Sequence, residues 1–327
     1  MKAIRPAISS LIVALFTAAL SIQATAQNYP ARQVRIVVNY TPGGPTDLVA
    51  RTVGSKMGEI LGQPFVIENM PSNNGSIGTQ NVARSAPDGY SLLFSTAGHT
   101  SVAAALWGDK LGFDPFKDIT PISMLVMSTQ MIVAHPSLGV KNIAELVALA
   151  KAKPGQLNFG SVGIGSSNQL GIELLKSMAK IDMVHVPYKG TAPAMQDLLA
   201  GRVQLMLNSM ATVIPLVRTG KLIGLAVGTT KRSSAAPDIP TMEELGYAGY
   251  QVSTWYALFA PSRTPAAIIS KLNPVVHQVL ANPQIAKTLN DQGAEPAGST
   301  PESVSKLMRE EYERWKKVIA DAKIIAE

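Results

Sequence analysis

The sequence predicts an α/β protein with two lobes, and three features lead to this prediction. From Val34 onward, short apolar runs, loops of Gly, Ser, Thr and Asn, and helical patterns follow one another repeatedly, which is typical of strand–helix units on a parallel sheet. Two longer apolar stretches, residues 122–134 and 251–260, have no helical period and are expected to run from one lobe to the other as extended strands. A chain of 327 residues is also long enough for about two domains.

The elements expected in the first lobe follow from apolar runs, turn residues and helix caps. Thr46 or Asp47 is the expected N-cap of the first helix, and Gly62 is expected to end it. In chain order, we expect a strand at 34–39, a turn at 42–45, a helix to residue 60, strands at 65–67 and 90–94 with a helix opened by residues 73–76 between them, and a loop of small residues at 95–100.

The second lobe repeats this alternation. Asn142 and Glu145 form a capping-box pattern at the start of one helix, and Ser166 or Ser167 opens the next. The expected elements are a helix from 142 that ends before 154, a strand at 157–159, a helix from 166 or 167, a strand at 183–186, a helix from 191, strands at 203–207 and 222–227, and a helix from 241 to 246 with a second capping box.

The lobes are expected to be discontinuous along the chain. Residues 27–126 and 251–327 are assigned to lobe 1, and residues 127–250 to lobe 2. From Pro301 onward, apolar residues recur on one face, which predicts an amphipathic C-terminal helix that closes on lobe 1. The residues of this face are Val304, Leu307, Met308, Trp315, Val318 and Ile319.

The first 26 residues have the pattern of a secretory signal peptide. Lys2 and Arg5 precede an apolar run over residues 7–20, and small residues at 24–26 end the segment. The run is short for a membrane span, which needs about 20 apolar residues. We therefore expect a soluble protein that is exported to the periplasm.

Composition and spacing exclude several classes of function. The net charge of +7 comes from scattered residues rather than from a basic run, so nucleic-acid binding is not expected. The chain has no cysteine, and its four histidines do not have the spacing of metal ligands, so we expect no metal. Asn168 stands where a dinucleotide fingerprint would put its third glycine, and no Walker lysine motif occurs, so we expect no cofactor. A hydrolase elbow needs G-x-S-x-G, but Phe159 stands in the place of the first glycine before Ser161. An enzyme is thus not expected.

Several loops that follow predicted strands share a composition suited to binding an anion. Residues 41–47, 95–100, 161–167 and 190–191 are rich in Gly, Ser and Thr, and most of them open helices. Glycine lets the main chain approach a ligand, hydroxyls donate hydrogen bonds, and helix N-termini present N–H groups with a partial positive charge. The alternative is that such loops are ordinary strand-to-helix turns.

Three segments, one of which covers the first of these loops, resemble the Bug family, the extracytoplasmic receptors of tripartite tricarboxylate transporters. The matching segments are Tyr-Thr-Pro-Gly-Gly-Pro-Thr-Asp at 40–47, Ala-Pro-Asp-Gly-Tyr at 86–90, and His-Val-Pro-Tyr-Lys-Gly at 185–190. The resemblance implies a type II periplasmic-binding-protein fold with crossover hinge strands, whose two lobes close on a small carboxylate in the cleft. It also implies that membrane permease subunits receive the ligand. Separately from the resemblance, we expect a monomer.

The resemblance assigns candidate ligand-binding residues position by position. Asp47 can act as an N-cap or contact ligand, and His99 can line the cleft or bond within its loop. Asn208 stands where Asp is common in the family, which favours dicarboxylates or aromatic carboxylates over amino acids. A ligand-sensing receptor and an α/β hydrolase or isomerase are the alternatives. The candidates are Tyr40, Thr41, Pro42, Gly43, Gly44, Thr46, Asp47, Thr96, His99, Ser161, Gly165, Ser166, Ser167, Tyr188, Gly190, Thr191 and Asn208.

Overall fold

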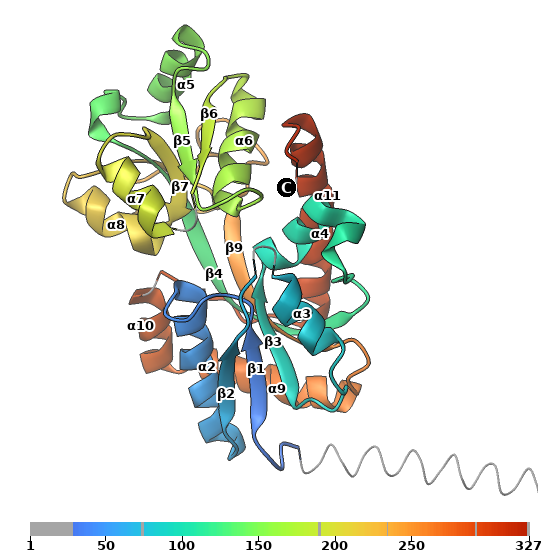
Figure 1. The fold of residues 1–327 in the computed structure, drawn as a ribbon. Coiled ribbons are helices and arrows are strands. Elements are labelled where there is room, and N and C mark those ends of the chain that lie inside the picture. Colours follow the sequence, from blue (N-terminus) through green and yellow to red (C-terminus); the bar gives the residue numbers. More distant parts are fainter. Residues whose placement is uncertain (1–28, 73–74, 189–190, 234, 292, 326–327) are drawn as a thin grey trace, which may run out of the picture.

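The structure, a computed structural model, describes residues 29–72, 75–188, 191–233, 235–291 and 293–325. The described chain forms two lobes, one above the other in Figure 1, each with a sheet covered by helices. The alternation of strands and helices confirms the predicted α/β class. The expected signal peptide at residues 1–26 lies outside the described residues.

The first lobe contains three parallel strands and one antiparallel neighbour. β1 (Val34–Val38) lies between β2 (Phe65–Asn69) and β3 (Ser91–Thr96), and β9 (Ser253–Pro261) pairs with β3 in the opposite direction. Val, Ile, Leu and Phe dominate the buried positions, as pleated and covered strands require. The helices are α2 (Pro45–Leu61), α3 (Ser76–Ala83), α4 (Ser101–Trp107), α9 (Ala266–Leu280) and α10 (Pro283–Asp291), with short 3-10 segments η1 (Ala97–His99) and η2 (Gly108–Leu111).

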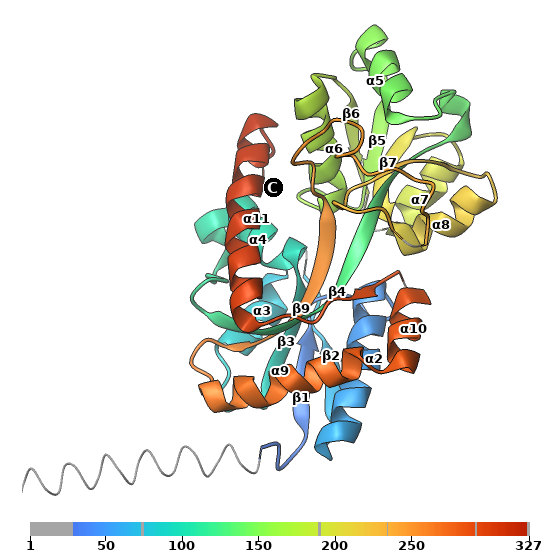
Figure 2. The ribbon, with the colours of Figure 1, turned by 180° about the vertical axis from the view of Figure 1, so that it is seen from behind.

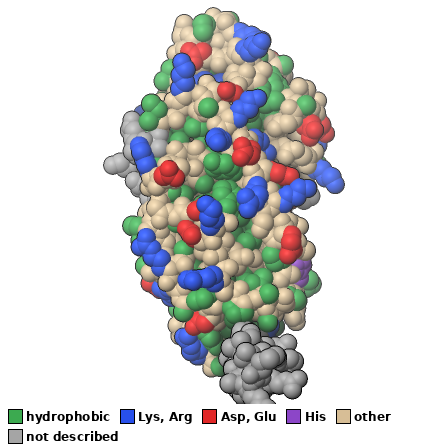
Figure 3. Space-filling view, turned by 90° about the vertical axis from the view of Figure 1, so that its right-hand side faces the viewer, with side chains coloured by type: hydrophobic (Ala, Val, Ile, Leu, Met, Phe, Trp, Pro, Cys, Tyr) green, Lys and Arg blue, Asp and Glu red, His purple; other side chains and the backbone are tan. Residues whose placement is uncertain are grey.

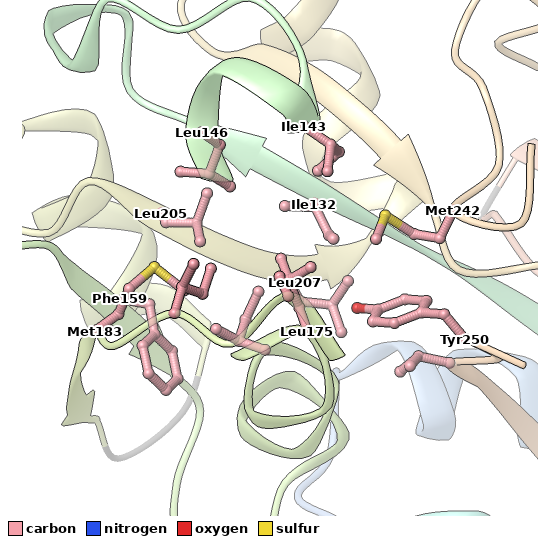
Figure 4. Close-up of a cluster of buried hydrophobic side chains, with 14 of the residues drawn as sticks. Ile132, Ile143, Leu146, Phe159, Leu175, Met183, Leu205, Leu207, Met242 and Tyr250 are labelled. Atoms are coloured by element: carbon pink, nitrogen blue, oxygen red, sulfur yellow. The ribbon is translucent and has the colours of Figure 1, made fainter. Parts of the chain in front are cut away.

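The second lobe repeats the arrangement. β5 (Asn158–Ser161) lies between β6 (Val184–Pro187) and β7 (Leu205–Ser209), all parallel. Figure 4 shows its core, in which Phe159, Leu175 and Leu207 belong to one buried cluster. The other elements are η3 (Pro136–Leu138), α5 (Ile143–Ala152), α6 (Ser167–Ala179), α7 (Thr191–Leu199), α8 (Met210–Arg218) and β8 (Ile223–Val227).

One long strand, β4 (Ile119–Ala134), runs through both lobes. It pairs with β9 from Ile119 to Thr129 and with β7 from Gln130 to Ala134. The described strands therefore follow the order β2-β1-β3-β9-β4-β7-β5-β6, with β8 and β10 (Glu295–Pro296) also paired to β4. The prediction of a crossover strand over residues 122–134 is confirmed.

The second expected crossover, residues 251–260, has a different form. β9 begins only at Ser253 and stays in the sheet of the first lobe. The chain passes between lobes just before it, where Val252 N donates to Gly228 O at 2.8 Å and Gly228 N donates to Gln130 O at 2.9 Å. The lobe boundaries at residues 126–127 and 250–251 stay a prediction.

The C-terminal helix α11 (Pro301–Asp321) contacts both lobes. Its first half buries Val304 and Met308 in a cluster of the first lobe. Its second half buries Trp315, Val318 and Ile319 in the core cluster of the second lobe, and Figure 2 shows the helix reaching up beside α6. The prediction that this helix closes on lobe 1 is thus wrong for its second half. An amphipathic pattern identifies the buried face of a helix but not what covers that face.

Two predicted helix limits are also wrong. The helix α2 begins at Pro45 with Gly44 as its N-cap, not at Thr46 or Asp47, because proline fits the first helical position, where no N–H is needed. The second capping box forms both of its hydrogen bonds, from Glu244 N to Thr241 Oγ1 and from Thr241 N to Glu244 Oε2, but only a turn follows them.

The surface seen in Figure 3 carries Lys and Arg side chains interspersed with Asp and Glu rather than gathered in one patch. Within the part of the chain that the structure describes, no helix is long and apolar enough to cross a membrane. In the same part, no group of three or more His, Asp or Glu side chains is placed to hold a metal ion.

Candidate functional site

The strand order of each lobe identifies the edge at which a ligand can bind. β1 lies between β2 and β3 in the first lobe, and β5 lies between β6 and β7 in the second. Open α/β sheets bind ligands outside the carboxyl ends of the strands where the order reverses. In this fold, those positions are the loops after β1, β3, β5 and β7, and they include most of the predicted site residues.

The pairing of β4 and β9 brings the strand ends of the two lobes to one place. Thr96, the last residue of β3, pairs with Tyr256, and two residues earlier on β9 Thr254 pairs with Ser128 of β4. Two residues further along β4, Gln130 pairs with Ser209, the last residue of β7. The carboxyl ends of β3 and β7 therefore meet beside the middle of β4.

Four hydroxyls, which we call the hinge hydroxyls, lie at this meeting point: Ser128, Ser167, Ser209 and Thr254. Ser128 Oγ lies 3.1 Å from Ser209 Oγ, and Ser167 Oγ lies 3.3 Å from Thr254 Oγ1. The second pair joins α6 of one lobe to β9 of the other. Sequence reasoning missed Ser128, Ser209 and Thr254. Ser128 and Thr254 could have been found because hydroxyl residues interrupt two otherwise apolar strands.

The loop after β1 is held by a buried carboxylate. Asp47 is 2% exposed, and its Oδ2 accepts hydrogen bonds from Gly43 N and Arg51 Nε, both at 2.9 Å. Its Oδ1 accepts from Asn69 Nδ2 at 2.9 Å, and the same Nδ2 donates to Tyr40 O at 3.1 Å. Burial raises the pKa of Asp47, but these hydrogen bonds lower it by more, so the group is ionised at neutral pH. Asp47 is therefore not the N-cap of α2. Its carboxylate holds the loop in place through the hydrogen bonds from Gly43 and Asn69.

An aromatic pair lies beside this loop. Tyr40 and His99 stack with ring centroids 4.1 Å apart, and Tyr40 Oη lies 2.5 Å from Thr96 Oγ1. Burial lowers the pKa of His99 to about 4, so its ring is neutral at pH 7. Gly75 lies against the His99 ring at a φ of 70°, where a Cβ would clash with that ring.

The remaining first-lobe candidates differ in exposure. Thr41 and Pro42 are exposed at the tip of the loop. Thr46 is buried, and its side chain hydrogen-bonds the Tyr256 hydroxyl. Gly43 has a φ of 78°, whereas Gly44 has a φ of −78°.

The loop after β5 uses many of its donors internally. Ser166 is the N-cap of α6; its Oγ donates to Gly163 O at 2.7 Å and accepts from Gln169 N at 3.3 Å. Gly165 N donates to Gln169 Oε1 at 2.8 Å. Ser161 Oγ lies 2.6 Å from His185 Nε2. The N–H groups in the first turn of α6 have no hydrogen-bond acceptor within the helix and are directed away from its N-terminus.

The other second-lobe candidates are spread over three elements. Tyr188 Oη donates to Asp197 Oδ2 at 2.7 Å, and burial together with this carboxylate raises the pKa of Tyr188 to about 12. Asn208 is buried, with Nδ2 3.3 Å from the sulfur of Met195 and Oδ1 accepting from Ser209 N at 2.7 Å. Thr191 is exposed at the start of α7, and Gly190 lies outside the described residues.

The electrostatics of these loops favour an anion without a basic side chain. The three longer helices that follow β1, β5 and β7 are α2, α6 and α8, and each N-terminus carries roughly half a positive charge. The one carboxylate among the candidates, Asp47, is paired with Arg51. Helix N-termini of this kind bind carboxylates and phosphates through main-chain N–H groups.

Comparison with known proteins agrees with this geometry. Residues 49–324 match the family model described as tripartite tricarboxylate transporter family receptor. The periplasmic binding protein BugD is 34% identical, with a TM-score of 0.78 over 91% of this chain and 100% of that chain. A protein of R. palustris solved with adipate is 35% identical, with a TM-score of 0.80 over 91% of this chain and 99% of that chain. MatC from Rhodopseudomonas palustris, with bound malate, is 35% identical, with a TM-score of 0.76 over 89% of this chain and 100% of that chain.

These similarities confirm the predicted type II periplasmic-binding-protein fold and the resemblance to Bug proteins. The family model covers well over half of the chain. This chain therefore belongs to the tripartite tricarboxylate transporter receptor family.

Proposed function

We propose that this protein captures a small carboxylate between its lobes, with dicarboxylates the favoured class. The observation that carries the proposal is the position of the α6 and α8 N-termini at the hinge hydroxyls Ser167 and Ser209, where no cation is needed to hold an anion. The relatives solved with adipate and malate support a dicarboxylate. An aromatic carboxylate remains the second class to test.

We further propose that the predicted candidates bind as two sets. The first-lobe set is the loop from Tyr40 to Asp47 with Thr96 and His99. In this set, Asp47 holds the loop in place and does not contact the ligand itself. The second-lobe set is Ser161, Gly165, Ser166 and Ser167, together with Tyr188, Thr191 and Asn208. Because the sets belong to different lobes, ligand favours the arrangement in which the lobes are together.

The protein is proposed to act in the periplasm and to deliver its ligand to membrane permease subunits without turning it over. The signal-peptide pattern of residues 1–26 supports export. Among the candidate-site residues, Ser161 with its neighbour His185 most resembles a catalytic nucleophile paired with a general base. However, burial and the Lys176 charge lower the pKa of His185 to about 4, which makes it a weak base.

Ligand binding to refolded protein tests the proposal, since refolding removes any co-purified ligand. Thermal unfolding is followed with adipate, malate and an aromatic carboxylate, each with and without a chelator. A saturating ligand at about 100 Kd adds roughly 2.7 kcal/mol, which raises Tm by several degrees. Amino acids are tested in the same assay; protection by an amino acid but by neither the dicarboxylates nor the aromatic carboxylate would refute the proposed ligand class, and product formation over time would refute a pure receptor.

A further inference from the structure

A carboxyl group is buried where α11 passes from one lobe to the other. Glu311 is 2% exposed. Its Oε2 accepts a hydrogen bond from Trp255 Nε1 at 2.9 Å, and its Oε1 accepts from Arg314 Nη2 at 3.2 Å. Trp255 is fully buried. A charge in such a place is costly unless it is fully compensated.

This group is connected to the hinge. Trp255 pairs with Met127 of β4, a few residues before β4 leaves the sheet of the first lobe. The residue before Trp255 is Thr254, whose hydroxyl contacts Ser167 at the start of α6. Glu311 therefore holds the strand that carries one of the contacts between the lobes.

The packing of α11 places any change of lobe orientation near Glu311. Val304 and Met308 are packed in the first lobe, and Trp315 and Val318 are packed in the second. If the lobes rotate apart, α11 must shift against one of them. The contacts that α11 loses then begin between residues 308 and 315. Such a shift would expose the Glu311 carboxyl to water, whereas it is buried in the arrangement described here.

Few other charges act on Glu311. On α11 itself, Arg314 pairs with it and Glu310 acts on Arg314. The strand β4 and the helix α4 contain no charged or titratable residue. On β9, Tyr256 is packed in a different cluster from Trp255. On α6, the charged residues are Glu173 and Lys176, which pair with each other at 3.0 Å.

We propose, resting on the proposed function, that Glu311 couples lobe closure to proton binding: the closed arrangement holds a proton on Glu311 that the open arrangement releases. Ligand, which favours the closed arrangement, then binds with uptake of a proton. Affinity rises as pH falls through neutrality.

The sign follows from burial. Burial raises the pKa of Glu311 to about 7, although Arg314 and the Trp255 hydrogen bond lower it in part. In the open arrangement, hydration returns the pKa to the usual glutamate value of about 4.3. A group whose pKa is higher in the closed state favours closure once the pH falls below that pKa. Between pH 8 and pH 6, the affinity is expected to rise about tenfold, with uptake of about half a proton at pH 7.

Titration calorimetry with adipate tests the coupling. Wild type, Glu311→Gln and the control Glu310→Gln are compared at pH 6, 7 and 8 in two buffers with different ionisation enthalpies. Gln keeps an acceptor for Trp255 Nε1, and Glu310 is an exposed neighbour on the same helix. Wild type and Glu310→Gln should show the pH dependence and the proton uptake, and Glu311→Gln should lose both. Equal pH profiles in wild type and Glu311→Gln would overturn the proposal.

A fluorescence titration separates this proposal from the proposed function. Tryptophan fluorescence is followed from pH 5 to pH 9 with and without saturating adipate, since Trp255 bonds directly to Glu311. With adipate, the closed wild type should show a transition near neutrality that Glu311→Gln lacks; without adipate, the transition should lie at lower pH. Arg314→Met, a second variant, should move the transition seen with adipate to higher pH because a stabilising positive charge is gone. If adipate binds but wild type shows no transition near neutrality, the proton coupling is refuted and the proposed function stands; if no carboxylate binds at any pH, the proposed function fails and the coupling that rests on it fails with it.

Discussion

The two adjacent glycines of the first-lobe loop differ in backbone conformation, and this difference predicts different costs of substitution. Gly43 has a φ of 78°, and a Cβ built there would meet nothing within 4 Å. The cost of Gly43→Ala is therefore the backbone strain alone, about 1–2 kcal/mol for an L-residue in the left-handed region. Gly44 has a φ of −78°, and a Cβ there would lie 3.7 Å from Thr41 O, an ordinary contact.

Gly44→Ser is the matched control. It places a favoured N-cap residue at the start of α2, where no side chain now caps the helix, so stability is expected to stay equal or rise. Thermal and urea unfolding of ligand-free protein measure the difference. In a chain of this size, with about 2.1 cal/mol/K of unfolding entropy per residue, Gly43→Ala should lower Tm by roughly 1.5 °C for each kcal/mol of strain. Equal stability of Gly43→Ala and wild type would show that the loop carries no left-handed strain.

Three further predictions concern the other parts of the site and its support. Ser166→Ala removes the N-cap of α6 and should cost about 1 kcal/mol in urea unfolding, whereas Ser167→Ala keeps the cap and should change ligand affinity more than stability. The pKa of Asp47 is lowered in the folded protein, so its stabilising contribution is present at neutral pH and is lost as pH falls through that pKa; Asp47→Asn should flatten the loss of stability between pH 5 and pH 2, measured by urea unfolding. Trp315→Ala should destabilise the protein by about 3–5 kcal/mol in calorimetry, since the side chain is packed in the core of the second lobe; a change below 1 kcal/mol would show that α11 does not brace that lobe.

Local sequence determined the elements where a cap and an apolar pattern agreed. Asn142 caps α5 through Glu145 N, as predicted, and of the two serines considered for α6 the structure uses Ser166. The pattern failed where length was decisive. After Thr241, Gly246 adopts a φ of 91° only five residues later, so the capping box closes a turn instead of a helix.

The location of the candidate site could be predicted, but its internal connections could not. Gly-rich loops after strands can be recognised in the sequence. The strand order of the sheet then brings these loops to one place. The partners that decide each side chain's role are distant: Asn69 lies 22 residues from Asp47, and Ser209 lies 81 residues from Ser128. No local pattern encodes such pairs, so Asp47 could be read as a cap or as a ligand contact until its buried partners were seen.

The packing of α11 limits how the lobes can separate. If opening exposed Trp315, Val318 and Ile319 completely, it would cost roughly 5–9 kcal/mol at about 1.5–3 kcal/mol for each buried side chain. Because every 1.4 kcal/mol is a factor of ten, an opening cost of that size would leave roughly one molecule in several thousand or fewer open, which is too rare to exchange ligand readily. Any separation of the lobes must therefore keep most of these contacts, with the change confined to a short part of α11. Glu311 lies in that part, between the residues packed in one lobe and those packed in the other. The geometry that keeps the free-energy cost of opening low would therefore also expose this one buried carboxyl to water.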